Sequence, residues 1–320
     1  NKEGKPGNKV GDWADVIDLD YTNRELWQYL TDTLIMWAKL VDGFRCDVAS
    51  FVPVEFWLQA RAAVSAVNPD CIWLAETVHR SYGCLARRHG VYSASDGEVF
   101  RAFDLEYEYD VREVFDRYLR GEVPLSRYLD ALNFQETCYP ANYNKLRFLE
   151  NHDQPRIVSR LGDAGRYWKE SAKMLAAAIH LMRGTPYIYQ GEELGMTNTR
   201  FRSLADCRDL EEINAWHEYV DDQQRVTPET MLACFDNVAR DNARTPMQWT
   251  RDTNAGFTTG KPWLPVHKDF MDCCVEAESE DGTSVLSYYR QMNRERTEGK
   301  ASEILLQGSY EELLHEDEHV

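Results

Sequence analysis

Short apolar segments alternate with segments of helical period along most of the chain, and this alternation restricts the possible fold more than any other feature. The apolar segments are GFRCDVAS (43–50), CIWLAE (71–76), RAFDLEYEY (101–109), KLRFLENHD (145–153) and TPYIYQGEE (185–193). Helical patterns precede or separate them at 22–41, 53–67, 111–121 and 170–184. Five strands that alternate with helices predict an α/β protein with a parallel sheet.

The first helix and the C-terminal third carry more local predictions. Thr22 and Glu25 are spaced as a capping box, and apolar side chains at helical spacing predict a buried face made of Leu26, Leu30, Trp37 and Leu40. Polar helices are predicted near 203–220 and 227–240, and a further helix at 283–296. The segment EILLQGSYEELL (303–314) is interpreted as two short strands about a turn.

Charge and cysteine content limit the partners. The 320 residues carry a net charge of -18, so a nucleic acid or an anionic membrane surface would repel the chain, and a neutral substrate is expected. The eight cysteines show neither a CxxC pair nor a metal-ligand spacing. Cys46 and Cys71 lie in apolar strands and are interpreted as packed thiols. This cysteine usage favours a reducing compartment, and we expect the cytoplasm.

Three acids lie at the C-terminal ends of three different predicted strands, namely Asp47, Glu76 and Asp153. Side chains alternate along a strand, so Arg45 and Asp47 share one face of the first strand. In a parallel α/β barrel all strands end at one rim, where catalytic groups gather. We therefore expect the three carboxyl groups to meet.

The surroundings of two of these acids differ in a way that suits glycoside hydrolysis. The guanidinium of Arg45 is expected to keep Asp47 ionised and nucleophilic. Glu76 follows the apolar Trp73 and Leu74 and faces other acids, so its pKa is expected to be raised, as a general acid requires. Retaining glycosidases use such a pair, with the two carboxyl groups about 5–5.5 Å apart.

Each of these residues also has an ordinary structural interpretation. Arg45 and Asp47 can form an ion pair that fills a layer of a barrel. Glu76 can be a solvated loop acid, and His152 can be a histidine that only satisfies local hydrogen bonds. The three acids in combination favour catalysis, because a scaffold has no reason to keep them together at one rim.

Five motifs in this order resemble the α-amylase superfamily of retaining α-glucoside hydrolases and transglucosidases. DGFRCDVAS resembles the nucleophile strand of that family, IWLAE the acid/base strand and ENHDQPR the strand of the third carboxylate. QGEELGM and RDNARTPMQW are similar to the oligo-1,6-glucosidase and α-glucosidase branch, whereas VIDLDY (16–21) looks more like an α-amylase. The front half therefore resembles amylases and the back half oligo-glucosidases.

The resemblance implies roles for single residues. Asp47 would be the nucleophile, Glu76 the proton donor, and Asp153 would hold sugar hydroxyls in the distorted transition state. Substrate-binding roles are implied for four further residues, Arg45, Val48, His152 and Arg156. A valine directly after the nucleophile is typical of enzymes that prefer α-1,6 links, whereas threonine accompanies α-1,4 links. Ala49 and Ser50 replace the Lys-His pair of endo-acting amylases, which favours exo-action.

The resemblance also implies an incomplete domain. A complete (β/α)8 barrel needs eight strand-helix units in about 250 residues, and the nucleophile strand already begins at residue 43. We interpret residues 1–300 as the C-terminal portion of a catalytic barrel with a helical insertion at about 197–265, and 301–320 as the start of a C-terminal β-sandwich. Such a partial barrel would leave sheet edges unpaired, so residues 1–320 alone are expected to be inactive.

Cofactor and function follow from the same resemblance. No cofactor is expected, although Asp18 occupies a position where amylases can bind calcium through oxygen ligands. The leading hypothesis is hydrolysis of α-1,6 or α-1,4 links in short gluco-oligosaccharides. A transglucosidase or sucrose isomerase would use the same intermediate with a sugar acceptor, and a non-catalytic barrel scaffold is the alternative from another class.

Overall fold

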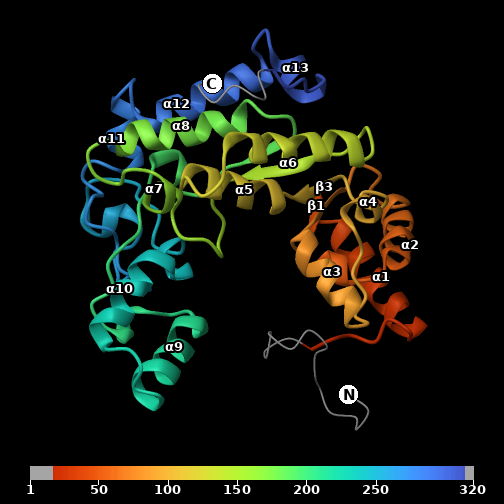
Figure 1. The fold of residues 1–320 in the computed structure, drawn as a ribbon, viewed down its shortest axis with the longest axis horizontal. Helices are drawn as coiled ribbons and strands as arrows, with labels where there is room; N and C mark the ends of the chain where they lie inside the picture. Colours follow the sequence, from red (N-terminus) through yellow and green to blue (C-terminus); the bar gives the residue numbers. More distant parts are fainter. Residues whose placement is uncertain (1–16, 314–320) are drawn as a thin grey trace. The chain divides into compact units, whose positions relative to one another are not determined.

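The computed structural model describes residues 17–313. The described residues divide into two compact units, the first comprising residues up to 146 together with 310–313, and the second residues 147–309. No helix in this part of the chain is both long enough and apolar enough to span a lipid bilayer. The predicted α/β class is confirmed, because five short strands occur in chain order among many helices (Figure 1).

The first unit is a sequence of strands and helices around a parallel sheet. Strands β1 (Gly43–Cys46), β2 (Ile72–Ala75), β3 (Leu105–Tyr107) and the start of β4 (Lys145–Phe148) pair in chain order and run parallel. The helices are α1 (Arg24–Ala38), α2 (Val54–Ser65), α3 (Arg80–Arg88), α4 (Asp96–Val99), α5 (Asp110–Leu119) and α6 (Leu125–Cys138). The sequence patterns did not predict α6.

Aromatic side chains form much of the core of the first unit. Trp57, Trp73 and Phe103 contact one another edge to face, and Phe56 packs against Trp57. Each ring is at least nine-tenths buried, so together they contribute several kcal/mol of hydrophobic stabilisation. This cluster packs β2 against α2, and β1 is held through its pairing with β2.

Helix α1 differs in detail from the sequence prediction. Its N-cap is Asn23, whose side chain accepts a hydrogen bond from the Glu25 amide, so the capping box predicted at Thr22 is wrong. The buried face contains Trp27, Thr31 and Ala38, whereas Trp37 is 48% and Leu40 75% exposed. The buried face is therefore rotated relative to the predicted one.

The second unit begins with the end of β4, which β5 (Thr185–Tyr187) follows in the strand order. Its helices are α7 (Ile157–Leu161), α8 (Trp168–His180), α9 (Leu210–Trp216), α10 (Pro228–Val238), α11 (Val275–Glu280), α12 (Val285–Thr297) and α13 (Ser302–Gln307). Helices α8 and α12 pack side by side (Figure 1). Helix α13 replaces the first of the two strands predicted for 303–314, and residues 308–313 form no strand.

Cys46 and Cys71 are buried free thiols, as predicted. The domain boundaries predicted at 197–265 and 301–320 stay predictions.

Candidate functional site

Asp47 and Glu76 lie one position beyond the ends of two paired strands. Cys46 at the end of β1 is in register with Ala75 at the end of β2. The pairing continues past the strands, because the Glu76 amide donates to the Cys46 carbonyl at 3.0 Å and the Ala49 amide to the Glu76 carbonyl at 2.8 Å. The sheet therefore brings Asp47 and Glu76 to the same edge.

One arginine connects these two acids. The guanidinium of Arg45 forms ion pairs with Asp47 Oδ1 and, at 2.7 Å, with Glu76 Oε1. The Asp47 side chain is 73% exposed and that of Glu76 only 13%. One acid is thus open to solvent and the other enclosed, and a single positive charge is shared between two carboxyl groups.

The environment of Glu76 favours its protonated form. Burial raises its pKa, the Arg45 charge and the Val48 N–H at 3.3 Å from Oε2 oppose this effect, and Asp47 raises the pKa further. The Tyr109 hydroxyl donates to Oε1 at 3.2 Å. The rise predicted from the sequence is confirmed, and a carboxylic acid with a raised pKa keeps a proton that it can donate.

Val48 contributes its backbone to this site. Its φ of 41° and ψ of 38° place a β-branched residue in the left-handed region, which costs about 1–3 kcal/mol. This conformation starts the turn from Asp47 into the 3-10 helix η1 (Ala49–Phe51) and directs the Val48 N–H to Glu76. Backbone strain of this kind occurs often at functional sites, and no residue pattern predicted it here.

Asp153 lies in the second unit and is held by arginines. Arg240 Nη1 is 3.4 Å and Arg244 Nη2 3.1 Å from Asp153 Oδ1, and His152 Nε2 is 3.2 Å from Oδ2. Arg244 also donates to the His152 carbonyl at 2.8 Å. The meeting of Asp153 with Asp47 and Glu76 stays a prediction.

The two arginines are themselves anchored by Asp209. Arg240 Nη2 is 2.7 Å from Asp209 Oδ1, and Arg244 Nη1 pairs with Asp209 Oδ2. Both arginines belong to the RDNARTPMQW motif, which the sequence analysis used only to assign a branch of the family. The position of two arginines within one motif was the signal that could have identified them.

Arg156 is placed differently from the prediction. Its side chain has no exposed surface, and its guanidinium contacts Glu150 at 2.9 Å, the Gln190 carbonyl at 2.7 Å and the Ala243 carbonyl at 3.3 Å. This burial argues against the expected contact of Arg156 with a sugar, which stays a prediction. Its contacts hold three segments of the second unit together.

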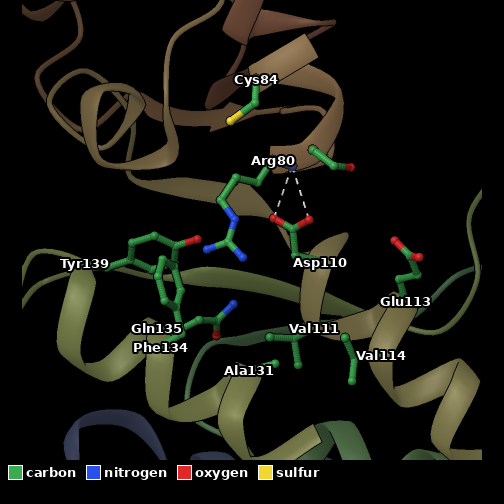
Figure 2. Close-up of a pocket in the computed structure, with 11 residues that line it drawn as sticks. Arg80, Cys84, Asp110, Val111, Glu113, Val114, Ala131, Phe134, Gln135 and Tyr139 are labelled. Atoms are coloured by element: carbon green, nitrogen blue, oxygen red, sulfur yellow. Dashed lines mark hydrogen bonds between the residues drawn. The ribbon is translucent and has the colours of Figure 1, made fainter. Parts of the chain in front are cut away.

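A separate pocket of about 340 Å³ opens between α3, α5 and α6 in the first unit (Figure 2). Arg80 stacks on Phe134 at 4.2 Å on one side, and Asp110 and Glu113 line the other. Neither Asp47 nor Glu76 lines this pocket. It is therefore distinct from the candidate catalytic edge.

A family model, "Alpha amylase, catalytic domain", matches residues 11–308. The chain belongs to the alpha-amylase family. Within this family the chain is 49% identical over 327 residues to "Probable oligo-1,6-glucosidase 2" of Bacillus subtilis, with 94% of the chain and 57% of that relative covered. The chain thus spans little more than half the length of this relative.

Two solved structures of other proteins are similar in fold to this chain. Trehalose-6-phosphate hydrolase of Bacillus licheniformis matches with a TM-score of 0.78 and 30% identity, covering 94% of the chain and 57% of that protein. Isomaltulose synthase of Klebsiella sp. LX3 matches with a TM-score of 0.75 and 27% identity, covering 94% and 58%. The recognition of the family and of its glucosidase branch is confirmed, as is the predicted α/β fold of a partial (β/α)8 barrel.

Proposed function

We propose that the complete protein is a retaining α-glucoside hydrolase that acts on short gluco-oligosaccharides. The observation that supports this most is the pair of acids at adjacent strand ends, one exposed and one enclosed, joined through Arg45. A nucleophile must be accessible and a general acid must keep its proton, and the two environments satisfy these opposite needs. The name of the Bacillus subtilis relative agrees with this substrate class.

The reaction has two steps in this proposal. An Asp47 oxygen attacks the anomeric carbon, the glycosidic C–O bond breaks, and the proton of Glu76 passes to the departing oxygen. In the second step Glu76 takes a proton from water, whose oxygen displaces Asp47 from the sugar. Asp153, next to His152, would hold sugar hydroxyls, and the side chain of Val48 would influence the choice between α-1,6 and α-1,4 links.

A transglucosidase is the second candidate, favoured by the similarity to isomaltulose synthase. The glucosyl group on Asp47 would then be transferred to a sugar hydroxyl instead of to water. Under either candidate the partner is an oligosaccharide, and the cytoplasm is the location that the cysteine usage favours. Calcium at Asp18 also stays a proposal.

Incubation with sucrose distinguishes a hydrolase from a transglucosidase, because only a transglucosidase gives isomerised disaccharides.

The assay uses residues 1–320 and the complete polypeptide encoded by the reading frame that contains them. We expect the complete polypeptide to hydrolyse isomaltose and p-nitrophenyl α-glucoside and first to release α-glucose, as retention requires. No turnover by the complete polypeptide, or release of β-glucose, would contradict the proposal. Turnover by residues 1–320 alone would contradict only the expectation that this portion is inactive.

A further inference from the structure

Three buried carboxyl groups of the second unit converge beside helix α9. Asp209 is the N-cap of α9, Glu212 lies in its first turn, and Asp241 lies in the short 3-10 helix η5 (Arg240–Asn242). Their exposed fractions are 7%, 4% and 0%. One oxygen of each lies within 4.8 Å of the others. Placing three charged groups so close together away from water is costly unless something compensates them.

In Glu212 and Asp241, one carboxyl oxygen accepts a hydrogen bond and the other has no hydrogen-bond partner. Glu212 Oε1 accepts a hydrogen bond from the Arg240 amide at 3.0 Å, and Asp241 Oδ2 accepts from the Arg208 and Asp209 amides at 2.6 and 3.1 Å. Glu212 Oε2 and Asp241 Oδ1 are buried and have no hydrogen-bond donor. Buried polar atoms usually have a partner, so each of these two oxygens is available to a bound ligand.

The neighbouring arginines do not supply that ligand. Arg240 pairs with Asp153, Asp209 and Glu211, and Arg244 pairs with Asp153 and Asp209. None of these ion pairs involves Glu212 or Asp241. The network therefore contains five carboxyl groups, those of Asp153, Asp209, Glu211, Glu212 and Asp241, against two guanidinium groups. A divalent cation would offset most of this excess negative charge.

The oxygens of the three acids bear on the size of the cation. Ca²⁺ binds oxygen at about 2.3–2.6 Å, so ligands on opposite sides of the ion lie up to about 5 Å apart. Mg²⁺ binds at about 2.0–2.1 Å and demands nearly ideal octahedral geometry, which limits that separation to about 4.2 Å. Oxygens within 4.8 Å of one another can surround an ion of either size. The second oxygens of Glu212 and Asp241 are already held by backbone amides, which restricts rearrangement to ideal octahedral geometry and favours the more tolerant Ca²⁺.

We propose that Asp209, Glu212 and Asp241 form a binding site for a calcium-sized divalent cation between the start of α9 and η5. Glu212 Oε2 and Asp241 Oδ1 are its principal ligand atoms, and Asp209 contributes a third carboxyl oxygen. The test of this site is independent of the proposed reaction, because it measures cation binding and not turnover.

The test titrates residues 1–320, freed of divalent cations with a chelator, with CaCl₂ in a calorimeter, and repeats the titration with MgCl₂. We expect one Ca²⁺ per chain and at least tenfold weaker binding of Mg²⁺. Glu212→Gln should weaken Ca²⁺ binding at least tenfold. The matched control is Glu211→Gln, the same change at the next residue of α9, whose side chain is 69% exposed. It should bind Ca²⁺ like the unchanged chain.

A second measurement separates lost ligation from lost folding. In EDTA the Glu212→Gln chain should melt no lower than the unchanged chain, because the substitution removes repulsion among buried carboxyl groups. CaCl₂ should raise the melting temperature of the unchanged chain and of Glu211→Gln, and should leave that of Glu212→Gln unmoved. Absence of Ca²⁺ binding, equal binding by Glu212→Gln, or equal loss in both variants would overturn the proposal.

Discussion

The carboxyl groups of the two units are held in opposite ways. In the first unit, two acids share the single guanidinium of Arg45. In the second unit, one acid, Asp153, receives two guanidinium groups that are fixed from behind by the buried Asp209. In the first arrangement one guanidinium serves two acids, so one of them can retain a proton. In the second, two guanidinium groups contact one carboxyl group and fix its direction.

This difference relates charge balance to chemical role. A general acid that must release and regain a proton benefits from incomplete neutralisation, because small changes in its surroundings then shift it between the protonated and ionised forms. An acid that orients hydroxyl groups benefits from rigid anchoring, since a catalytic group loses efficiency when its geometry loosens. We therefore expect substitutions in the first unit to change chemistry and pH dependence, and those in the second to change stability and substrate binding.

The strongest test of the comparison replaces the proposed nucleophile. In the complete polypeptide, Asp47→Ala should lower kcat about 10⁴-fold or more, since loss of a nucleophile removes the covalent pathway. Steady-state hydrolysis of p-nitrophenyl α-glucoside measures this. Added azide should restore turnover and give a β-glucosyl azide, because azide attacks from the face that Asp47 vacates.

Glu76→Ala is the matched variant for this rescue. Azide should here give the α-glucosyl azide, because Asp47 still forms the covalent intermediate. If both variants gave the same azide anomer, the assigned roles of Asp47 and Glu76 would be wrong.

A large effect on stability is expected at Arg156 in the second unit. Arg156→Met should lower the free energy of unfolding by about 3–5 kcal/mol, because it leaves the buried Glu150 charge without its partner. Urea denaturation of residues 1–320 measures the change. Adding Glu150→Leu should recover part of the loss. Unchanged stability, with only KM raised in the complete polypeptide, would instead support the sugar contact predicted from the sequence.

A smaller effect is expected where Asp153 is anchored. Arg244→Gln should raise KM about tenfold in the complete polypeptide, which corresponds to one charge-assisted hydrogen bond of about 1.5 kcal/mol. Arg240→Gln should have a weaker effect, since its contact with Asp153 is longer and it does not hold the His152 carbonyl. The reverse order would mean that Arg240, not Arg244, is the main support of Asp153.

The sequence predicted those features that depend on local geometry. Strand alternation was sufficient to pair Arg45 with Asp47, and the apolar flank of Glu76 was sufficient to predict the direction of its pKa shift. The arginines on Asp153 were missed because they lie 87 and 91 residues away along the chain. Such contacts depend on how loops fold back, which residue periodicity does not encode.

Two further features were missed for local reasons. A motif identifies Arg156 by residue type but not by environment, so the burial of its side chain was not predicted. In α1, apolar residues occur around most of the helix, and spacing alone could not choose which of them face the core. Trp37 and Leu40 were predicted to be buried, and the packing instead buries Trp27 and Ala38.

A still smaller effect, on the pH dependence of kcat/KM, is expected at Tyr109. The general acid must carry a proton, so kcat/KM falls as pH rises through the pKa of Glu76, which burial holds above its usual value. The Tyr109 hydroxyl donates to Glu76 and favours its ionised form, so Tyr109→Phe should raise that pKa further. The alkaline limb should move up by about half a unit to one unit, the equivalent of about 1 kcal/mol.

Tyr143→Phe provides the control for this pH profile. It removes a hydroxyl that hydrogen-bonds Glu136, away from the strand-end acids. Its pH profile should match that of the unchanged protein. A downward shift for Tyr109→Phe would mean that the hydroxyl stabilises the protonated form of Glu76.

The smallest effect is expected at Val48, where the backbone of the first unit is strained next to the strand-end acids. Glycine usually lowers stability relative to alanine by about 0.5–1 kcal/mol, but a left-handed conformation costs any other residue about 1–2 kcal/mol. At Val48, with its φ of 41°, the order should reverse, so that Val48→Gly is more stable than Val48→Ala by up to about 1 kcal/mol. Both variants lose the same isopropyl contacts and keep the N–H that faces Glu76. Urea denaturation of the two chains measures the difference, and a more stable alanine variant would show that this turn is not left-handed in solution.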